Sequence, residues 1–131
     1  MAPAAAETIF NFFNDTGFSP ESFDLIVTGD LGAVGSLLLN QLLQLKGLDI
    51  SKQHTDCGLL IYDRQKQDVH AGGSGCGCSA AVLCSHFLPE MRNGNIKNML
   101  FAATGALLSP TTVQQGESIP GITHAISLEV E

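Results

Sequence analysis

The chain has 131 residues, 44% of them hydrophobic and 15% charged, so it holds enough apolar side chains for the core of one small domain. A net charge of -7, with only six scattered Lys and Arg residues, excludes the basic surface that nucleic-acid binding requires and disfavours an electrostatic grip on anionic lipid. No apolar run reaches the roughly 20 residues that span a bilayer. The N-terminus "MAPAAAETIF" shows no secretory signal, so we expect four free thiols rather than disulfides.

The N-terminal part of the chain predicts a helix, a strand and a second helix. The first helix covers Pro3–Asn14, where apolar side chains share one face, and Gly17 offers a stop. The short apolar run Phe23–Val27 is typical of a strand buried on both faces. Leucines at helical spacing follow, and Gly47 is a suitable left-handed cap, so Asp24–Lys46 is expected to form strand, turn and helix.

The middle of the chain predicts a second strand and a third helix on either side of a loop. The apolar run Cys57–Asp63 is expected to be a strand or an extended stretch, and Arg64–Gly75 is polar and rich in glycine. Small residues open a helix predicted over Cys76–Met91, in which Pro89 predicts a kink or an early end.

The C-terminal part predicts two strands joined by a long loop. Asn98–Ala106 is an apolar strand, Leu107–Gly121 is the loop, and Thr123–Glu131 alternates as a half-exposed terminal strand does. The element order αβαβαββ predicts an α/β fold in one domain over residues 1–131. Its sheet is expected to be mostly parallel under helical cover, with an antiparallel last strand because a loop joins the last two strands.

The segment "HAGGSGCGCSAAVLCSHF" concentrates the candidate chemistry of the chain. A zinc site is disfavoured, because Cys76 and Cys78 would lie about 200° apart around a helix. Cys76 at a helix start is a candidate nucleophile with His70 or His124 as its base. Alternatively the turn binds an anion through free N–H groups, or its glycines only permit close packing. The other two histidines, His54 and His86, have no distinctive spacing and predict ordinary hydrogen-bonded or surface residues.

Asp30 directly follows the first predicted strand, and Thr104 and Gly105 end the third. Ligands of open α/β sheets gather beyond the carboxyl ends of the strands, so these residues form the expected rim of a site. The competing interpretation is that Asp30 caps the helix that follows it.

Four segments together carry a resemblance to a known family: "FDLIVTGDLGAVGS" (23–36), "DISKQHTDCGLLIYD" (49–63), "HAGGSGCGCSAAVL" (70–83) and "FAATGALLSPTTVQQGESIPGITHA" (101–125). In order and spacing they resemble the C-terminal part of the stage V sporulation protein AD family. The resemblance implies a thiolase-like fold of the β-ketoacyl synthase superfamily, built from two βαβαβαββ halves. The chain is similar to one half, which implies a fragment of a longer protein that lacks its N-terminal half.

The resemblance also implies that the chain is not an enzyme. Condensing enzymes of the superfamily take a His and an Asn from this half, and those positions fall on Gly29 and Ser74, while the nucleophilic cysteine belongs to the other half. Acyl condensation needs these groups together. The alternative is a degenerate acyl-transfer enzyme that uses Cys76.

The implied function is the binding of dipicolinic acid (pyridine-2,6-dicarboxylate), as such or as its calcium chelate, during its uptake into the developing spore. Asp30, Ser74, Gly75 and Cys76 are the predicted ligand contacts, with no cofactor and no metal held by the protein. The implied partners are membrane proteins of the same sporulation system and a further copy of the chain. The implied location is the cytoplasm of the developing spore, at the periphery of its inner membrane.

Overall fold

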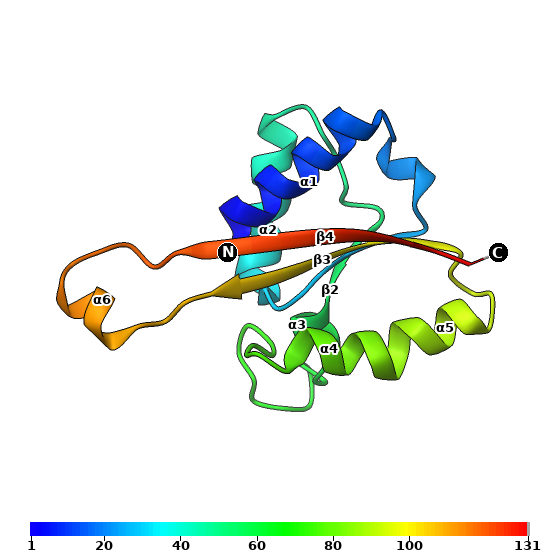
Figure 1. Ribbon diagram of the computed structural model, residues 1–131. Coiled ribbons are helices and arrows are strands. Elements are labelled where there is room, and N and C mark those ends of the chain that lie inside the picture. Colours follow the sequence, from blue (N-terminus) through cyan, green and yellow to red (C-terminus); the bar gives the residue numbers. More distant parts are fainter. Residues whose placement is uncertain (131) are drawn as a thin grey trace.

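Four strands form one mixed sheet in the computed structural model, which describes residues 1–130. The strands are β1 (Leu25–Thr28), β2 (His54–Asp56), β3 (Asn98–Ala106) and β4 (Gly121–Glu129). They lie in the order β2-β1-β3-β4. Strand β1 runs parallel to β2 and to β3, and β4 pairs antiparallel with β3 (Figure 1). The prediction of a mostly parallel sheet with an antiparallel last strand is therefore confirmed.

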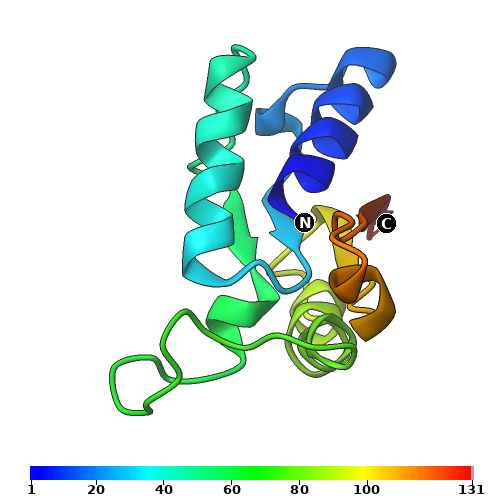
Figure 2. The ribbon, with the colours of Figure 1, turned by 90° about the vertical axis from the view of Figure 1, so that its left-hand side faces the viewer.

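Two helices, α1 (Ala2–Thr16) and α2 (Gly32–Leu45), cover one face of the sheet and lie side by side (Figure 2). Their buried side chains, among them Ile9, Leu39 and Leu43, pack with Ile26 and Leu100 of the sheet. Helix α1 ends at Thr16, two residues after the predicted Asn14, and α2 ends at Leu45, one residue before the predicted Lys46. Left-handed glycines follow them, with φ of 71° at position 17 and 80° at position 47, a conformation that glycine adopts without steric cost.

The opposite face is covered by a short helix, α3 (Cys57–Leu60), and by one longer helical segment. That segment joins α4 (Cys78–Val82), the π-helical turn η2 (Leu83–Phe87) and α5 (Leu88–Arg92) without a break (Figure 1). Successive residues of β3 face opposite helical layers. Met99 and Phe101 pack with Phe87 on this side, whereas Leu100 belongs to the core on the other side.

The strand predicted over Cys57–Asp63 is wrong. The second strand is β2, three residues earlier, and the apolar run forms α3 instead. A short apolar run does not distinguish a buried strand from a buried helical turn. The Asp56 side chain decides the outcome, because it accepts a hydrogen bond from the Gly58 N–H and so starts a helix.

Of the two outcomes predicted at Pro89, a kink or an early end, the early end does not occur, and the helix begins at Cys78 rather than at Cys76. The segment continues past the proline to Arg92. Just before the proline, the Leu88 N–H donates to the Leu83 carbonyl in a π-type bond. A proline lacks an N–H and displaces the carbonyl four residues before it, so a wider turn accommodates it within a helix.

The β3–β4 connection forms an arm that extends away from the body of the molecule (Figure 1). It contains the short helix α6 (Pro110–Gln114), which the prediction of a loop over Leu107–Gly121 missed. Ser109 accepts from the Thr112 N–H at the start of α6, a capping signal present in the sequence. Strand β4 begins two residues before the predicted start, and the predicted end at Glu131 lies outside the described residues.

Candidate functional site

The carboxylate of Asp30 joins three segments that are far apart in the sequence. One oxygen, Oδ2, accepts hydrogen bonds from the Ser74 hydroxyl and from the Gly75 N–H, both at 3.0 Å. The other, Oδ1, accepts from the Thr104 hydroxyl at 2.8 Å, and that hydroxyl accepts from the Asp30 N–H at 3.0 Å. The loop after β1 is therefore fastened both to the glycine-rich turn and to the end of β3.

An open depression adjoins this cluster at the carboxyl ends of β1 and β3. It has a volume of about 230 Å³, and we call it the Asp30 depression. Its lining consists of Met1, Asp30, Ser74, Gly75, Cys76, Ser79, Thr104, Gly105, Ala106 and Leu108. The four residues predicted as ligand contacts thus share one concave surface with the predicted rim of Thr104 and Gly105. Binding itself stays a prediction.

Asp30 does not cap the helix that follows it, so the competing interpretation of this residue is wrong. The carboxylate at the start of α2 is that of Asp56, which accepts from the N–H groups of Leu31 and Gly32 at 2.9 Å each. Asp56 is fully buried and also accepts from the Thr28 hydroxyl at 2.6 Å and from the Gly58 N–H at 2.9 Å. One carboxylate from β2 therefore satisfies the first turns of both α2 and α3.

Sequence analysis missed the role of Asp56, although a signal was present. An aspartate at the end of a strand, followed by Cys-Gly, is a candidate cap for the next helix. Asp56 can also accept from the N–H groups at the start of α2 because β1 and β2 lie side by side. No local sequence pattern predicts this strand pairing.

His54 of β2 contacts polar side chains of β1 and α2. Its Nε2 is 3.0 Å from the Thr28 hydroxyl oxygen and its Nδ1 is 3.0 Å from the amide nitrogen of Asn40. The Thr28 hydroxyl donates to Asp56, so we assign the Nε2–H tautomer, with Nδ1 accepting from Asn40. Burial lowers the pKa of His54, and the nearby Asp56 carboxylate partly opposes this shift.

Gly29, the position where the resemblance places a catalytic histidine, has no room for a side chain. An added Cβ would lie 2.7 Å from both the backbone nitrogen and the hydroxyl oxygen of Thr104. Ser74, where the resemblance places a catalytic asparagine, has its hydroxyl engaged by Asp30. Gly29 thus carries no side chain, and the Ser74 hydroxyl donates its proton to Asp30.

The four cysteines fall into two environments. Cys57 and Cys78 are buried, and burial raises the pKa of both thiols, that of Cys57 to about 12. Cys76 and Cys84 are exposed. His70 lies on an exposed loop with its Nδ1 3.8 Å from an Asp68 oxygen. Within residues 1–130, neither His70 nor His124 hydrogen-bonds a cysteine, and no cluster of three or more His, Cys, Asp or Glu side chains is arranged to hold a metal ion.

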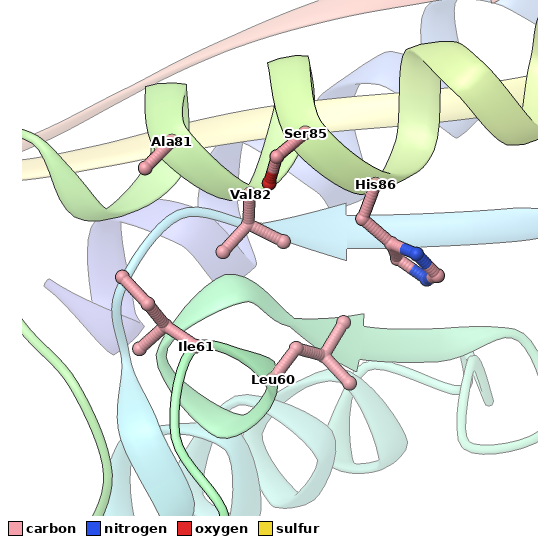
Figure 3. Close-up of a pocket in the computed structure, with 6 residues that line it drawn as sticks. All are labelled: Leu60, Ile61, Ala81, Val82, Ser85 and His86. Atoms are coloured by element: carbon pink, nitrogen blue, oxygen red, sulfur yellow. The ribbon is translucent and has the colours of Figure 1, made fainter.

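A second cavity of about 300 Å³ lies between α3 and the long helical segment (Figure 3). Leu60, Ile61, Ala81, Val82, Ser85 and His86 line it. Its walls are mostly apolar, and only Ser85 and His86 carry polar side chains there. The Asp30 depression combines a charged group, hydroxyls and a backbone N–H in one place, so it is the better candidate site for a polar ligand.

Comparison with known proteins identifies the relatives of this chain. The family described as Stage V sporulation protein AD (SpoVAD) matches residues 1–129. A curated protein of Bacillus subtilis (strain 168), named Stage V sporulation protein AD, is 49% identical over 129 residues. The match covers 98% of this chain and 38% of that relative, so the chain spans well under half of its relative's length. Among the described residues, no helix has the length and apolar character needed to cross a bilayer.

Proposed function

The chain belongs to the stage V sporulation protein AD family, and from this premise we propose that the Asp30 depression is a non-catalytic site for dipicolinic acid, bound as its calcium chelate. The role in sporulation follows from the family, whereas the ligand is our proposal. The observation that carries it is the convergence of Asp30, Ser74, Gly75 and Thr104 on one small depression.

The charge of Asp30 favours the chelate over the free dianion. A carboxylate at the surface of the depression repels a second carboxylate that approaches without a cation. Calcium prefers oxygen ligands, and the Asp30 carboxylate and the hydroxyl oxygens of Ser74, Ser79 and Thr104 line the depression. In this proposal calcium arrives already bound by the chelator, and Asp30 adds one protein oxygen to it. The Ser79 hydroxyl, which lines the depression and does not hydrogen-bond Asp30, then donates to a carboxylate of the chelator.

Calorimetric titration of this chain tests the proposal, with dipicolinate alone and with an equimolar mixture of calcium and dipicolinate. We expect heat of binding from the mixture and weaker or no binding of free dipicolinate. Asp30→Asn is expected to weaken binding of the mixture about tenfold, since it removes a charged contact. Ser79 lines the depression but does not hydrogen-bond Asp30. Ser79→Ala is therefore a second variant, which changes the binding surface and leaves the hydrogen bonds of Asp30 intact.

Ser85→Ala is the matched control, because Ser85 lines the cavity of Figure 3 and not the Asp30 depression. Absence of heat with either titrant refutes binding by this chain. Binding that Asp30→Asn and Ser79→Ala leave unchanged, or that Ser85→Ala weakens equally, places the ligand elsewhere. Melting curves of each variant show whether a loss of binding reflects a loss of folding.

A degenerate acyl-transfer enzyme is the second candidate, favoured by one observation: Cys76 is exposed and lines the Asp30 depression. A nucleophilic cysteine needs an activated thiolate. Alkylation by iodoacetamide at neutral pH compares Cys76 with Cys84, the other exposed thiol. Equal rates support the binding site, and a much faster reaction at Cys76 supports the enzyme.

The partners and the location belong to the same proposal. We infer that the chain is one half of a thiolase-like fold and packs with the N-terminal half of such a fold. We also infer that it works with membrane proteins of its sporulation system at the inner membrane of the spore. The length of the relative supports this. The match covers 38% of the relative, so the other 62% (100% − 38%) has no counterpart in the matched residues. Exposed apolar residues of α3 and α5, Leu60 and Leu88, suit such packing. Co-purification of separately expressed halves tests it, and halves that never associate refute it.

A further inference from the structure

Helix α2 carries a second apolar stripe on the face that points away from the sheet. Its buried side consists of Gly32, Ser36, Leu39 and Leu43. On the opposite side Val34, Leu37 and Leu45 are 72%, 62% and 85% exposed, and Leu38 is 41% exposed. In Figure 2, α2 stands at the left margin of the molecule, with α1 on one side of it and no element on the other.

The absence of charge sets α2 apart from an ordinary surface helix. The segment "GAVGSLLLNQLLQL" contains no Asp, Glu, Lys or Arg, whereas a surface helix usually carries charges on its outer face. The chain as a whole has a net charge of -7. Two copies of this chain therefore repel one another over much of their surfaces, but their α2 faces meet without any pair of like charges.

The stripe is self-complementary about Gln41. Leu37 and Leu45 lie four residues before and four residues after it, on the same face of the helix. In an antiparallel pair related by a two-fold axis at Gln41, Leu37 of one copy meets Leu45 of the other and the two Gln41 amides face each other. The surface over Gln41, Gln44 and Leu45 is shallow and open, so a partner's Leu37 can lie against it without a clash. Two such helices can pack side chain between side chains.

A lipid membrane fits the apolar face of α2 less well than a second copy of the chain does. Helices that lie on membranes usually carry Lys and Arg beside their apolar face, and α2 has neither. The adjoining Lys46 lies over the Phe10 ring, 4.6 Å from its centroid. The overall negative charge also opposes contact with anionic lipid.

We propose that the α2 face is a homodimer interface, formed by antiparallel packing of α2 against α2 of a second copy around Gln41. This inference goes beyond the proposed ligand site and does not depend on it. The helix is about 21 Å long, and one helix pair buries less than the roughly 1,600 Å² of a standard interface. The dimer is accordingly weak, with a dissociation constant on the order of micromolar.

Sedimentation velocity of this chain over a wide range of concentrations tests the interface. We expect a reversible dimer in the wild type and, for the double variant Leu37→Asp with Leu45→Asp, a dissociation constant raised about tenfold or more. Both side chains are exposed, so the melting temperature of the variant should stay close to that of the wild type. Leu107→Asp, on the arm and 66% exposed, is the matched control and should leave dimerisation unchanged.

A cross-link measures the two-fold axis directly. In a background with both exposed cysteines changed to serine, Gln41→Cys should form a covalent dimer on mild oxidation, and Asn11→Cys on the outer side of α1 should not. A chain that stays monomeric at every concentration refutes the interface. A dimer that survives the double aspartate variant, or that Leu107→Asp abolishes, places the contact on another face and refutes it equally.

Discussion

Replacement of Asp56 by asparagine should cause a large loss of stability. The Asp56 carboxylate is fully buried and accepts four hydrogen bonds, from the Thr28 hydroxyl and from the backbone N–H groups of Leu31, Gly32 and Gly58. Asparagine keeps the shape but replaces one acceptor oxygen by an NH₂ group, which is itself a donor.

The magnitude follows from the bonds that asparagine fails to make. Oδ2 of Asp56 accepts from Gly32 and Gly58, and Oδ1 accepts from Thr28 and Leu31. An NH₂ in place of Oδ2 faces the N–H groups of Gly32 and Gly58. In place of Oδ1 it faces the Leu31 N–H, while the Thr28 hydroxyl can turn to accept from it and donate to the Thr55 carbonyl. At least one donor therefore loses its acceptor, at a cost of about 1–3 kcal/mol. The loss of charge at two helix starts adds a smaller amount. We therefore expect a loss of about 2–4 kcal/mol in the free energy of unfolding.

Urea titration followed by circular dichroism measures this loss, and calorimetry should show a melting temperature lowered by roughly 10–15 °C. Asp24→Asn is the matched control. Asp24 also accepts from two backbone N–H groups, those of Lys97 and Asn98, but it is exposed, so water replaces the lost bonds. Its cost should stay below about 1 kcal/mol. A loss under about 1 kcal/mol for Asp56→Asn, or equal losses for the two variants, would refute the role given to the buried carboxylate.

Three further predictions concern the loop after β1 and its surroundings. Gly29→Ala places a Cβ against Thr104 and should cost about 1–3 kcal/mol by overpacking, whereas Gly77→Ala meets nothing within 4 Å and should be nearly neutral in the same urea titration. The folded pKa of His54 is lowered by burial, so the unfolded state binds more protons below about pH 6.5; the free energy of unfolding should fall as pH falls through that range, and His54→Gln should flatten this slope. Cys57 is buried with a pKa raised to about 12, so it should react with a thiol reagent only after denaturation, while the two exposed thiols react in the native protein.

Opposite outcomes would contradict each of these. Equal stabilities of the two alanine variants would mean that the close approach at Gly29 does not exist in solution. A pH dependence that is unchanged by His54→Gln would assign the acid sensitivity to other groups. Rapid labelling of Cys57 in the native protein would show that its side of the core opens easily.

Much of the fold was predictable because its signals are local. The leucines of α2 recur at helical spacing, the run at Asn98–Ala106 is continuous and apolar, and glycines stand where helices end. The prediction failed at Cys57–Asp63, where a short apolar run fits a strand and a buried turn equally well. At Pro89 the early end, one of the two predicted outcomes, does not occur, because a π turn without a sequence pattern of its own accommodates the proline.

The candidate site, too, was predictable from the sequence only in part. By itself the sequence placed Asp30, Thr104 and Gly105 at one edge, since parallel strands end at the same edge of a sheet. Only the tertiary structure decided what the carboxylates do there: Asp30 binds the turn and β3, and Asp56 caps two helices. A hydrogen bond depends on where the two groups lie in space. For residues more than twenty positions apart, the packing of the whole sheet sets that position, and no local pattern of side chains records it.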